Sequence, residues 1–367
     1  MGWSFKNLMA NNHKNRLLEK MIPVLAVFLA LIISTFIILM AGKDPVLAFR
    51  FLIYGAVGNI NFIAETLAKT TPLLICSLGL AISFKANLTS IGAEGQMLIG
   101  GLFGTVAALY IPCPDNLRLI LVLSAGAAGG AVFGAIPGFL KAKYGISEII
   151  NTIMLNYIAT YIVAYLLNGP MKDVKSGYQQ SYMLPSSAKM PVILSDTRLH
   201  LGFIIGIALV FVYHILINKT PAGFKLRAVG SNCDASRYAG IHVTRYIVLA
   251  LTLSGAMAGI AGAIEVSAMH GRLLNGFTSN VGFDAIAIAL LGKLSPIGIL
   301  ISSLFFGALR VGSNSMQMGV QVPSSLIDMI QGMIILFILC DKLILQISAD
   351  RKLKKQKKVL VEETGKA

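Results

Sequence analysis

The sequence predicts an all-α protein, a polytopic bundle of membrane-spanning helices, and three observations support this. The 367 residues are 56% hydrophobic and only 13% charged, and the mean hydropathy is +0.76. Soluble domains carry about 25% charged residues, so the missing charge must reflect long uncharged segments. One of these, 21–42, has 22 residues without a charge, enough to cross ~30 Å of hydrocarbon at ~1.5 Å per residue. A soluble enzyme, a disordered chain and a disulfide scaffold are excluded.

Apolar segments separated by polar loops predict about ten transmembrane helices. They lie at 21–42, 63–84, 93–111, 119–140, 148–168, 201–218, 246–268, 283–292, 296–312 and 324–347. The first has no cleavage site for a signal peptide, so we expect it to be a retained helix. The segment 283–292 is too short to span alone, and eight spans with a re-entrant hairpin at this point are the alternative.

The distribution of basic residues predicts which parts face the cytoplasm. Lys and Arg gather in an N-terminal segment (1–20), in the loop 219–245 and in a C-terminal tail (348–367). The positive-inside rule places these parts in the cytoplasm, so both termini are expected there, on either side of a transmembrane domain at 21–347. The net charge of +15 follows from this topology, and we expect no nucleic-acid partner; the basic tail is expected to meet anionic membrane lipid.

The chain has no motif for a metal or a nucleotide. Its four cysteines lack CxxC spacing, its five histidines lack HExxH pairing, and no glycine-rich loop ends in Gly-Lys-Ser/Thr. We therefore expect no metal site, no bound cofactor, no catalytic residue and no ATPase site in this chain. The cysteines are Cys76, Cys113, Cys233 and Cys340.

Glycines recur every four residues in two of the expected spans. This spacing stacks them on one helix face, and small residues at this spacing let helix backbones approach closely in a membrane. We predict a tightly packed bundle. The glycines are Gly126, Gly130, Gly134 and Gly138 in one span, and Gly255 and Gly259 in another.

Polar residues within spans are costly, so each is a functional candidate. Helix capping and helix–helix hydrogen bonds are the structural alternative, above all for Glu148 and Asp284, which lie beside expected helix starts. For Glu94 the two interpretations are balanced. The other candidates are Gln96, Asn151, Asn156 and Glu265.

The basic loop 219–245 contains one expected helix of its own. Residues 234–239 favour a short amphipathic helix bounded by Gly230 and Gly240. Such a helix suits the docking of a soluble partner. A plain connecting loop, whose arginines set topology and meet anionic lipid, is the equal alternative.

Four stretches together resemble the permease subunits of ATP-binding-cassette importers, in the branch that carries simple sugars and nucleosides. The resemblance covers about 20–347. The stretches are NLTSIGAEGQ at 87–96, EIINTIMLNY at 148–157, LRAVG at 226–230 with YAGI at 238–241, and FDAIAIALLG at 283–292 with PIG at 296–298.

The resemblance implies half of a translocation pathway in the cell membrane. The expected partners are a second homologous permease, a cytoplasmic subunit with two ATPase domains that hydrolyses ATP, and an extracellular lipoprotein or periplasmic protein that binds substrate. The branch looks like that of the nucleosides; ribose or another simple sugar is the alternative. An ion-driven secondary transporter is a weaker alternative, because no inverted repeat is evident.

The resemblance also implies two groups of functional residues. Those of the substrate pathway are Glu94, Gln96, Asn151, Asn156, Phe283 and Asp284. Those that couple the permease to the ATPase are Gly223, Leu226, Arg227, Gly230, Asn232, Ala235, Arg237, Tyr238 and Gly240.

Overall fold

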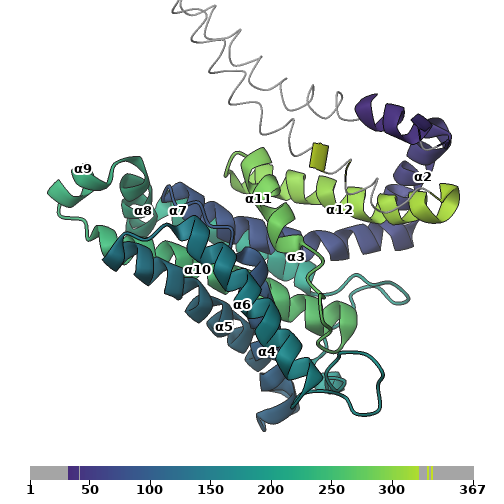
Figure 1. Ribbon diagram of the computed structural model, residues 1–367, viewed down its shortest axis with the longest axis horizontal. Helices are drawn as coiled ribbons and strands as arrows, with labels where there is room; N and C mark the ends of the chain where they lie inside the picture. Colours follow the sequence, from purple (N-terminus) through teal and green to yellow (C-terminus); the bar gives the residue numbers. More distant parts are fainter. Residues whose placement is uncertain (1–31, 41, 322–328, 330–331, 334–367) are drawn as a thin grey trace, which may run out of the picture. The chain divides into compact units, whose positions relative to one another are not determined.

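The computed structural model describes residues 32–40, 42–321, 329 and 332–333, and in this part of the chain the regular structure is helical. A helix over Ile32–Met40 precedes the labelled elements of Figure 1. These are α2 Pro45–Val57, α3 Ile60–Lys85, α4 Ala93–Tyr110, α5 Asp115–Tyr144, α6 Glu148–Asn168, η1 Ser186–Ala188, α7 Gly202–Lys219, α8 Pro221–Ser231, α9 Cys233–Tyr238, α10 Val243–Glu265, η2 Val266–His270, α11 Val281–Leu291 and α12 Pro296–Val320.

Six of the described helices are long and apolar enough to cross a membrane, or seven if the bent pair Ile32–Met40 and α2 counts as one span. The expected all-helical membrane fold is therefore confirmed, whereas the expected ten spans are not. α4 is not among the six, because its first turn carries Glu94 and Gln96, and α11 is too short. The expected span 324–347 and both termini lie outside the described residues, apart from isolated positions.

The chain divides into two compact units. The larger is Leu52–Gly312 and contains α3 to α11. The smaller takes in the residues before 52 and after 312, of which 32–40, 42–51, 313–321, 329 and 332–333 are described. All the geometry below belongs to the larger unit.

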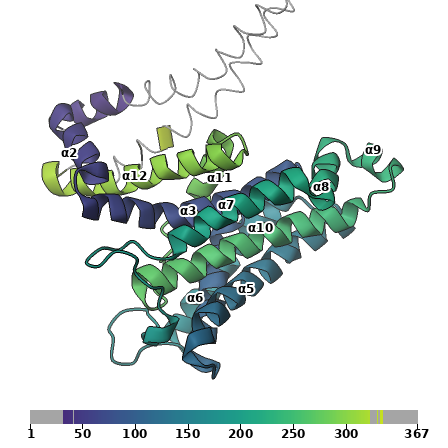
Figure 2. The ribbon, with the colours of Figure 1, turned by 180° about the vertical axis from the view of Figure 1, so that it is seen from behind.

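The centre of the larger unit is the contact between α5 and α10, which lie side by side (Figures 1 and 2). A Cβ placed on Gly130 would lie 2.2 Å from the carbonyl oxygen of Gly255, and one on Gly126 would lie 3.0 Å from that of Gly259. The helices touch backbone to backbone because these residues have no side chain. The predicted close packing through the glycine stripes is confirmed.

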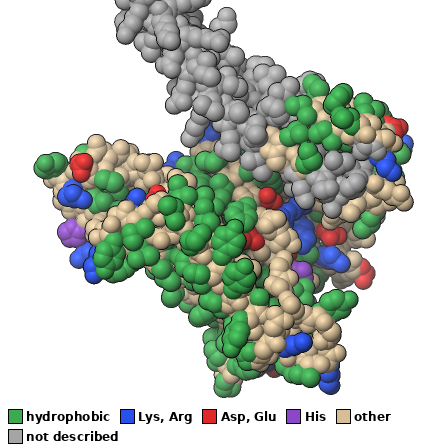
Figure 3. Space-filling model, viewed as in Figure 1, with side chains coloured by type: hydrophobic (Ala, Val, Ile, Leu, Met, Phe, Trp, Pro, Cys, Tyr) green, Lys and Arg blue, Asp and Glu red, His purple; other side chains and the backbone are tan. Residues whose placement is uncertain are grey.

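The two ends of this bundle differ. α8 and α9 lie at one end, and the loop 169–200 lies at the other (Figures 1 and 2). Hydrophobic side chains cover much of the face seen in Figure 3, and Lys, Arg and His side chains are seen at the end with α8 and α9 as well as elsewhere on this face. That apolar flank is the surface expected to meet lipid.

Candidate functional site

A cavity of about 590 Å³ lies between α6, the start of α4 and the segment that leads into α11. This volume falls within the ~300–1,000 Å³ range of small-molecule sites. The lining combines aromatic rings, amides, hydroxyls and one carboxylate. Its residues are Ile91, Glu94, Leu98, Ile153, Asn156, Tyr157, Thr160, Asn275, Gly276, Thr278, Ser279, Asn280 and Phe283.

Glu94 fastens the start of α11 to the start of α4. Its carboxylate accepts hydrogen bonds from the hydroxyl of Thr278 and, at 2.8 Å, from the backbone N–H of Gly282. A negative charge at a helix N-terminus is favourable because it faces unpaired N–H groups and the positive end of the helix dipole. A Cβ on Gly282 would lie 2.3 Å from the backbone nitrogen of Glu94, so only glycine allows this approach.

The segment before α11 has an unusual backbone held by an arginine. Ser279 and Asn280 have φ values of 46° and 65°, a region that non-glycine residues seldom adopt. The guanidinium of Arg310 in α12 donates to the carbonyl oxygen of Ser279 and, at 3.1 Å, to the carboxylate of Asp284. Strained backbone of this kind persists only where its surroundings hold it, and it is frequent at binding sites.

Asn156 lies on the cavity wall but uses its amide within the protein. Its Oδ1 accepts from the N–H of Gly95 at 2.9 Å, and its Nδ2 donates to the carbonyl oxygen of Ile91 at 2.8 Å. Thr152, one turn earlier in α6, accepts from the N–H of Ile91. The side chain of Asn156 therefore fixes α6 against the start of α4.

The cavity brings together three of the six residues predicted for the substrate pathway: Glu94, Asn156 and Phe283. The other three lie elsewhere. Gln96 is 1% exposed and approaches Gly134 of α5, and Asp284 pairs with Arg310. The Nδ2 of Asn151 is buried without a hydrogen-bond partner among the described residues.

Sequence reasoning missed six of the eight polar residues that line the cavity: Tyr157, Thr160, Asn275, Thr278, Ser279 and Asn280. Tyr157 directly follows the predicted Asn156, and it is 59% exposed in the larger unit. Asn275, Ser279 and Asn280 come from the segment between η2 and α11. The signal available was the density of Gly, Asn, Thr and Ser in 275–280, which indicates a polar loop between two apolar segments.

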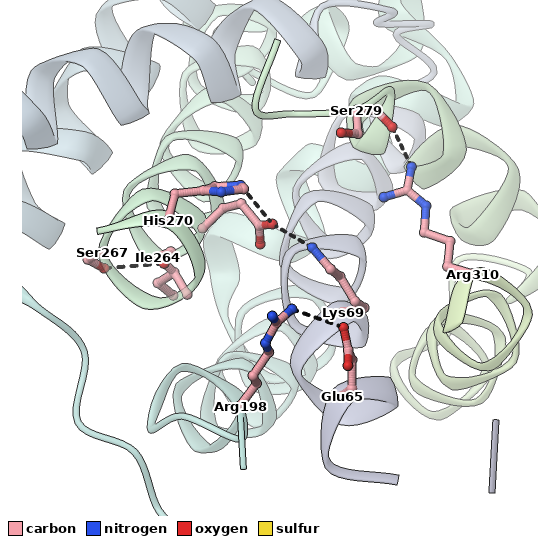
Figure 4. Close-up of polar contacts among 9 residues, drawn as sticks. Glu65, Lys69, Arg198, Ile264, Ser267, His270, Ser279 and Arg310 are labelled. Atoms are coloured by element: carbon pink, nitrogen blue, oxygen red, sulfur yellow. Dashed lines mark hydrogen bonds and ion pairs between the residues drawn. The ribbon is translucent and has the colours of Figure 1, made fainter. Parts of the chain in front are cut away.

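A second polar cluster surrounds Glu265, one of the predicted polar residues inside spans, and Figure 4 labels its members Lys69 and His270. Its carboxylate accepts from the ammonium group of Lys69 at 3.1 Å, and the ring of His270 lies 3.7 Å away. The side chain of Glu265 is 4% exposed. Beside it, Arg198 of the loop 169–200 pairs with Glu65 of α3, so this cluster ties α3, α10 and the loop together.

The pair Lys141 and Glu148 marks the opposite end of the bundle. Lys141, near the end of α5, lies 2.9 Å from the carboxylate of Glu148, the first residue of α6. The same carboxylate accepts from the N–H of Thr89. Glu148 thus holds the corner between α5 and α6, in line with the structural interpretation of this residue.

The loop 219–245 contains two helices where the sequence predicted one. The predicted helix 234–239 corresponds to α9, but α8 was missed, and Gly230 lies within α8 instead of marking a boundary. Leu226 is 2% exposed, and a Cβ on Gly230 would lie 2.2 Å from the carbonyl oxygen of Lys85. A Cβ on Gly223 would lie 2.0 Å from that of Leu216.

α9 is exposed, whereas α8 is packed against the bundle. Tyr238 is 95% exposed, and the side chain of Arg237 is 71% exposed. Ala235 and Gly240 are exposed as well, and Asn232 is the N-cap whose side chain accepts from two N–H groups of α9. The predicted coupling residues therefore form two groups: Gly223, Leu226 and Gly230 fix α8 to the bundle, and those of α9 form a free surface. Arg227 is partly buried.

No group of three His, Cys, Asp or Glu side chains that could hold a metal ion occurs among the described residues. The cavity combines hydrogen-bonding side chains with apolar ones, and α9 presents an exposed surface. This arrangement suits the passage of a small polar molecule.

Comparison with known proteins places the chain among transport proteins. Residues 62–339 match the family described as the permease component of branched-chain amino acid transport systems. The chain is 35% identical to the guanosine ABC transporter permease protein NupP of Bacillus subtilis over 88% of this chain and 94% of that protein. It is 33% identical to the nucleoside ABC transporter permease protein NupB of Lactococcus lactis, over 89% and 92%.

A sugar transporter is similar to nearly the same degree. The glucose ABC transporter permease protein TsgB13 of Haloferax volcanii is 32% identical over 86% of both chains.

Proposed function

This chain belongs to the family of branched-chain amino acid transport system permease components, and we propose that it forms half of the translocation pathway of an ATP-binding-cassette importer for nucleosides in the bacterial cell membrane. The similarity to NupP and NupB, both named for nucleoside or guanosine transport, supports this substrate class. The cavity beside Glu94 is the observation that carries the proposal.

A nucleoside has a flat aromatic base and a sugar with hydroxyl groups, and the cavity offers partners for both. The rings of Phe283 and Tyr157 are exposed at its wall, where a base can stack on them. The side chains of Asn275, Ser279 and Asn280 supply hydrogen-bonding groups for the sugar or the base edge. A wall of mixed polar and apolar side chains suits a permease that binds its substrate weakly, because the substrate must leave as readily as it enters.

The cavity is not fully enclosed, and a second, homologous permease subunit is the proposed partner on its open side. An extracellular or periplasmic binding protein would deliver the substrate. ATP would be hydrolysed by a cytoplasmic subunit with two ATPase domains, since this chain has no phosphate-binding loop. The exposed α9 is the proposed contact for that subunit, and α8 would transmit its movement to α3 and α7, against which it packs.

Uptake of labelled uridine, adenosine, guanosine, ribose and glucose by cells with and without this chain tests the proposal. Loss of nucleoside uptake alone is the expected result. Loss of ribose or glucose uptake alone would overturn the nucleoside assignment and favour a simple sugar, the alternative that the similarity to TsgB13 supports. A protonophore added while ATP persists should leave uptake intact; immediate loss would indicate an ion-driven transporter.

A further inference from the structure

A groove of about 560 Å³ runs between the end of α5 and the start of α10. α5 and α10 are antiparallel, since Gly126 meets Gly259 and Gly134 meets the backbone of Leu251. The last of these glycine contacts is that of Gly138 with Val248, and the groove begins there. Its lining is Phe139, Ala142, Lys143, Thr244, Arg245, Val248, Leu249 and Thr252.

The groove is apolar along its length and basic at its end. Phe139 is 50% exposed and Leu249 is 38% exposed. Lys143 and Arg245 are both exposed, and neither forms an ion pair with any described residue. No acidic residue lines the groove, and the neighbouring Glu148 is occupied by Lys141.

Two aromatic rings hold one of these cations near the groove. The ammonium group of Lys143 lies 5.3 Å from the ring centroid of Phe139 and 5.3 Å from that of Tyr144. Cation–π contacts of this length favour a defined position for the charge. Tyrosine and lysine side by side are also typical of the membrane interface, where headgroups lie.

We propose that this groove binds one anionic phospholipid, with an acyl chain along Phe139, Val248 and Leu249 and the phosphate between Lys143 and Arg245. Both α5 and α10 are long and apolar enough to span the membrane, so lipid is the occupant that we propose for an open groove on them. The two cations select negative headgroups, as basic pockets between transmembrane helices on the cytoplasmic side do. Free phosphate would leave the apolar wall uncovered.

The position of the groove gives the lipid a structural consequence. α10 begins at Val243, shortly after α9 ends at Tyr238. A phosphate held by Arg245 would steady the corner from which α9 projects. The groove, on the end of α5 and the start of α10, therefore lies at the end of the bundle from which α9 projects.

Fluorescence quenching by brominated lipids tests the proposal on the full chain in bilayers. The chain contains one tryptophan, Trp3, so Trp3→Phe provides a dark background. Phe139→Trp then places a reporter in the groove and keeps a ring beneath Lys143. Leu249→Trp is a second groove reporter in case the first variant does not fold. Ile120→Trp, at a 62% exposed position far from the groove on α5, reports ordinary lipid.

Brominated phosphatidylglycerol should quench the groove reporter with an apparent affinity up to about thirtyfold above that of brominated phosphatidylcholine, because each of two basic residues attracts the negative headgroup. The Ile120→Trp reporter should show no such preference. Lys143→Gln with Arg245→Gln should abolish the preference, whereas Lys225→Gln, an exposed lysine of α8, should leave it unchanged.

Three results would overturn the proposal. The first is equal quenching of the groove reporter by both lipids. The second is a preference that survives the double substitution or appears equally at Ile120→Trp. The third is an absence of quenching by either lipid in the assembled transporter, which would make the groove a contact between subunits.

Discussion

Glu94 and Gly282 join the first turns of two helices that are 188 residues apart in the sequence, through a 2.8 Å hydrogen bond from the N–H of Gly282 to the carboxylate. The contact places a negative charge at the start of α11 and brings the two backbones close together. Since Glu94 lines the proposed substrate cavity and Gly282 is adjacent in sequence to the lining residue Phe283, the shape of the cavity depends on this junction.

Substitution of Glu94 should damage transport and stability together. Glu94→Ala removes both hydrogen bonds and the charge, at about 1–3 kcal/mol for each bond to a charged group. Glu94→Gln keeps one acceptor and should have the smaller effect. Melting temperature in detergent and uptake per assembled transporter measure the two losses. Glu65→Gln, which breaks an ion pair with an exposed partner, is the matched control. Normal uptake and melting of Glu94→Ala would contradict this role.

The sequence singles out Glu94 as a candidate, but it does not reveal the contacts that this residue makes. A carboxylate in an apolar segment is informative by itself, because charge within a membrane is costly. Its partners Thr278 and Gly282 lie far along the chain, and no spacing rule connects them. Asn156 illustrates the same limit: its position was predicted, whereas its hydrogen bonds to Ile91 and Gly95 come from the packing of α6 on α4.

The helices themselves were predictable where apolar runs were long. The expected segments 63–84 and 148–168 agree closely with α3 and α6. α8 was missed because its buried face amounts to Gly223, Leu226 and Val229 in a basic, polar stretch. Such a helix forms because α7 and α3 cover it, and this tertiary contact leaves little trace in the local sequence.

The glycine contact between α5 and α10 should not tolerate a methyl group. In Gly130→Ala the new Cβ would lie 2.2 Å from the carbonyl oxygen of Gly255 and 2.7 Å from the Cα of Gly259. Backbone atoms cannot move aside cheaply, so we expect a loss of about 1–3 kcal/mol and a lower melting temperature. Gly177→Ala, where nothing lies within 4 Å, is the control. Equal melting of the two variants would show that the helices separate freely.

The ion pair of Lys69 and Glu265 should respond unequally to loss of either partner. Lys69→Met leaves the carboxylate of Glu265, 4% exposed, without its cation, and removing one partner of a buried pair costs about 3–5 kcal/mol. Glu265→Gln leaves Lys69, which is 26% exposed and can reach water, so its effect should be smaller. Thermal unfolding of the single variants and of Lys69→Met with Glu265→Gln forms a double-mutant cycle. Additive losses would indicate that the two groups do not interact.

The exposed face of α9 should couple the permease to its ATPase without stabilising the fold. Arg237→Glu with Tyr238→Ala alters side chains that are 71% and 95% exposed. The free energy of unfolding should therefore stay within about 0.5 kcal/mol of that of the wild type. Substrate-stimulated ATP hydrolysis by the assembled transporter should fall at least about tenfold, a loss of about 1.4 kcal/mol in contact energy. Gly230→Glu should instead disrupt the fold, because it drives a side chain into the backbone of Lys85. Unchanged hydrolysis in the α9 variant would place the contact elsewhere.

His200 should make stability depend on pH. The ring is 1% exposed and neither nitrogen has a hydrogen-bond partner among the described residues. Burial lowers the pKa of His200 below its usual 6.5, and the charge of Lys69 lowers it further, against the opposing effect of Glu265. The unfolded chain therefore binds the proton more readily than the folded one. The free energy of unfolding keeps its full value above about pH 6.5 and decreases as the pH drops, by at most ~1.4 kcal/mol per pH unit. Thermal unfolding between pH 5 and 8 should show this slope in the wild type and a shallower slope in His200→Phe, which lacks the contribution of this ring. His242→Phe, at an exposed position before α10, should retain the slope, and an identical slope in His200→Phe would assign the pH dependence to another group.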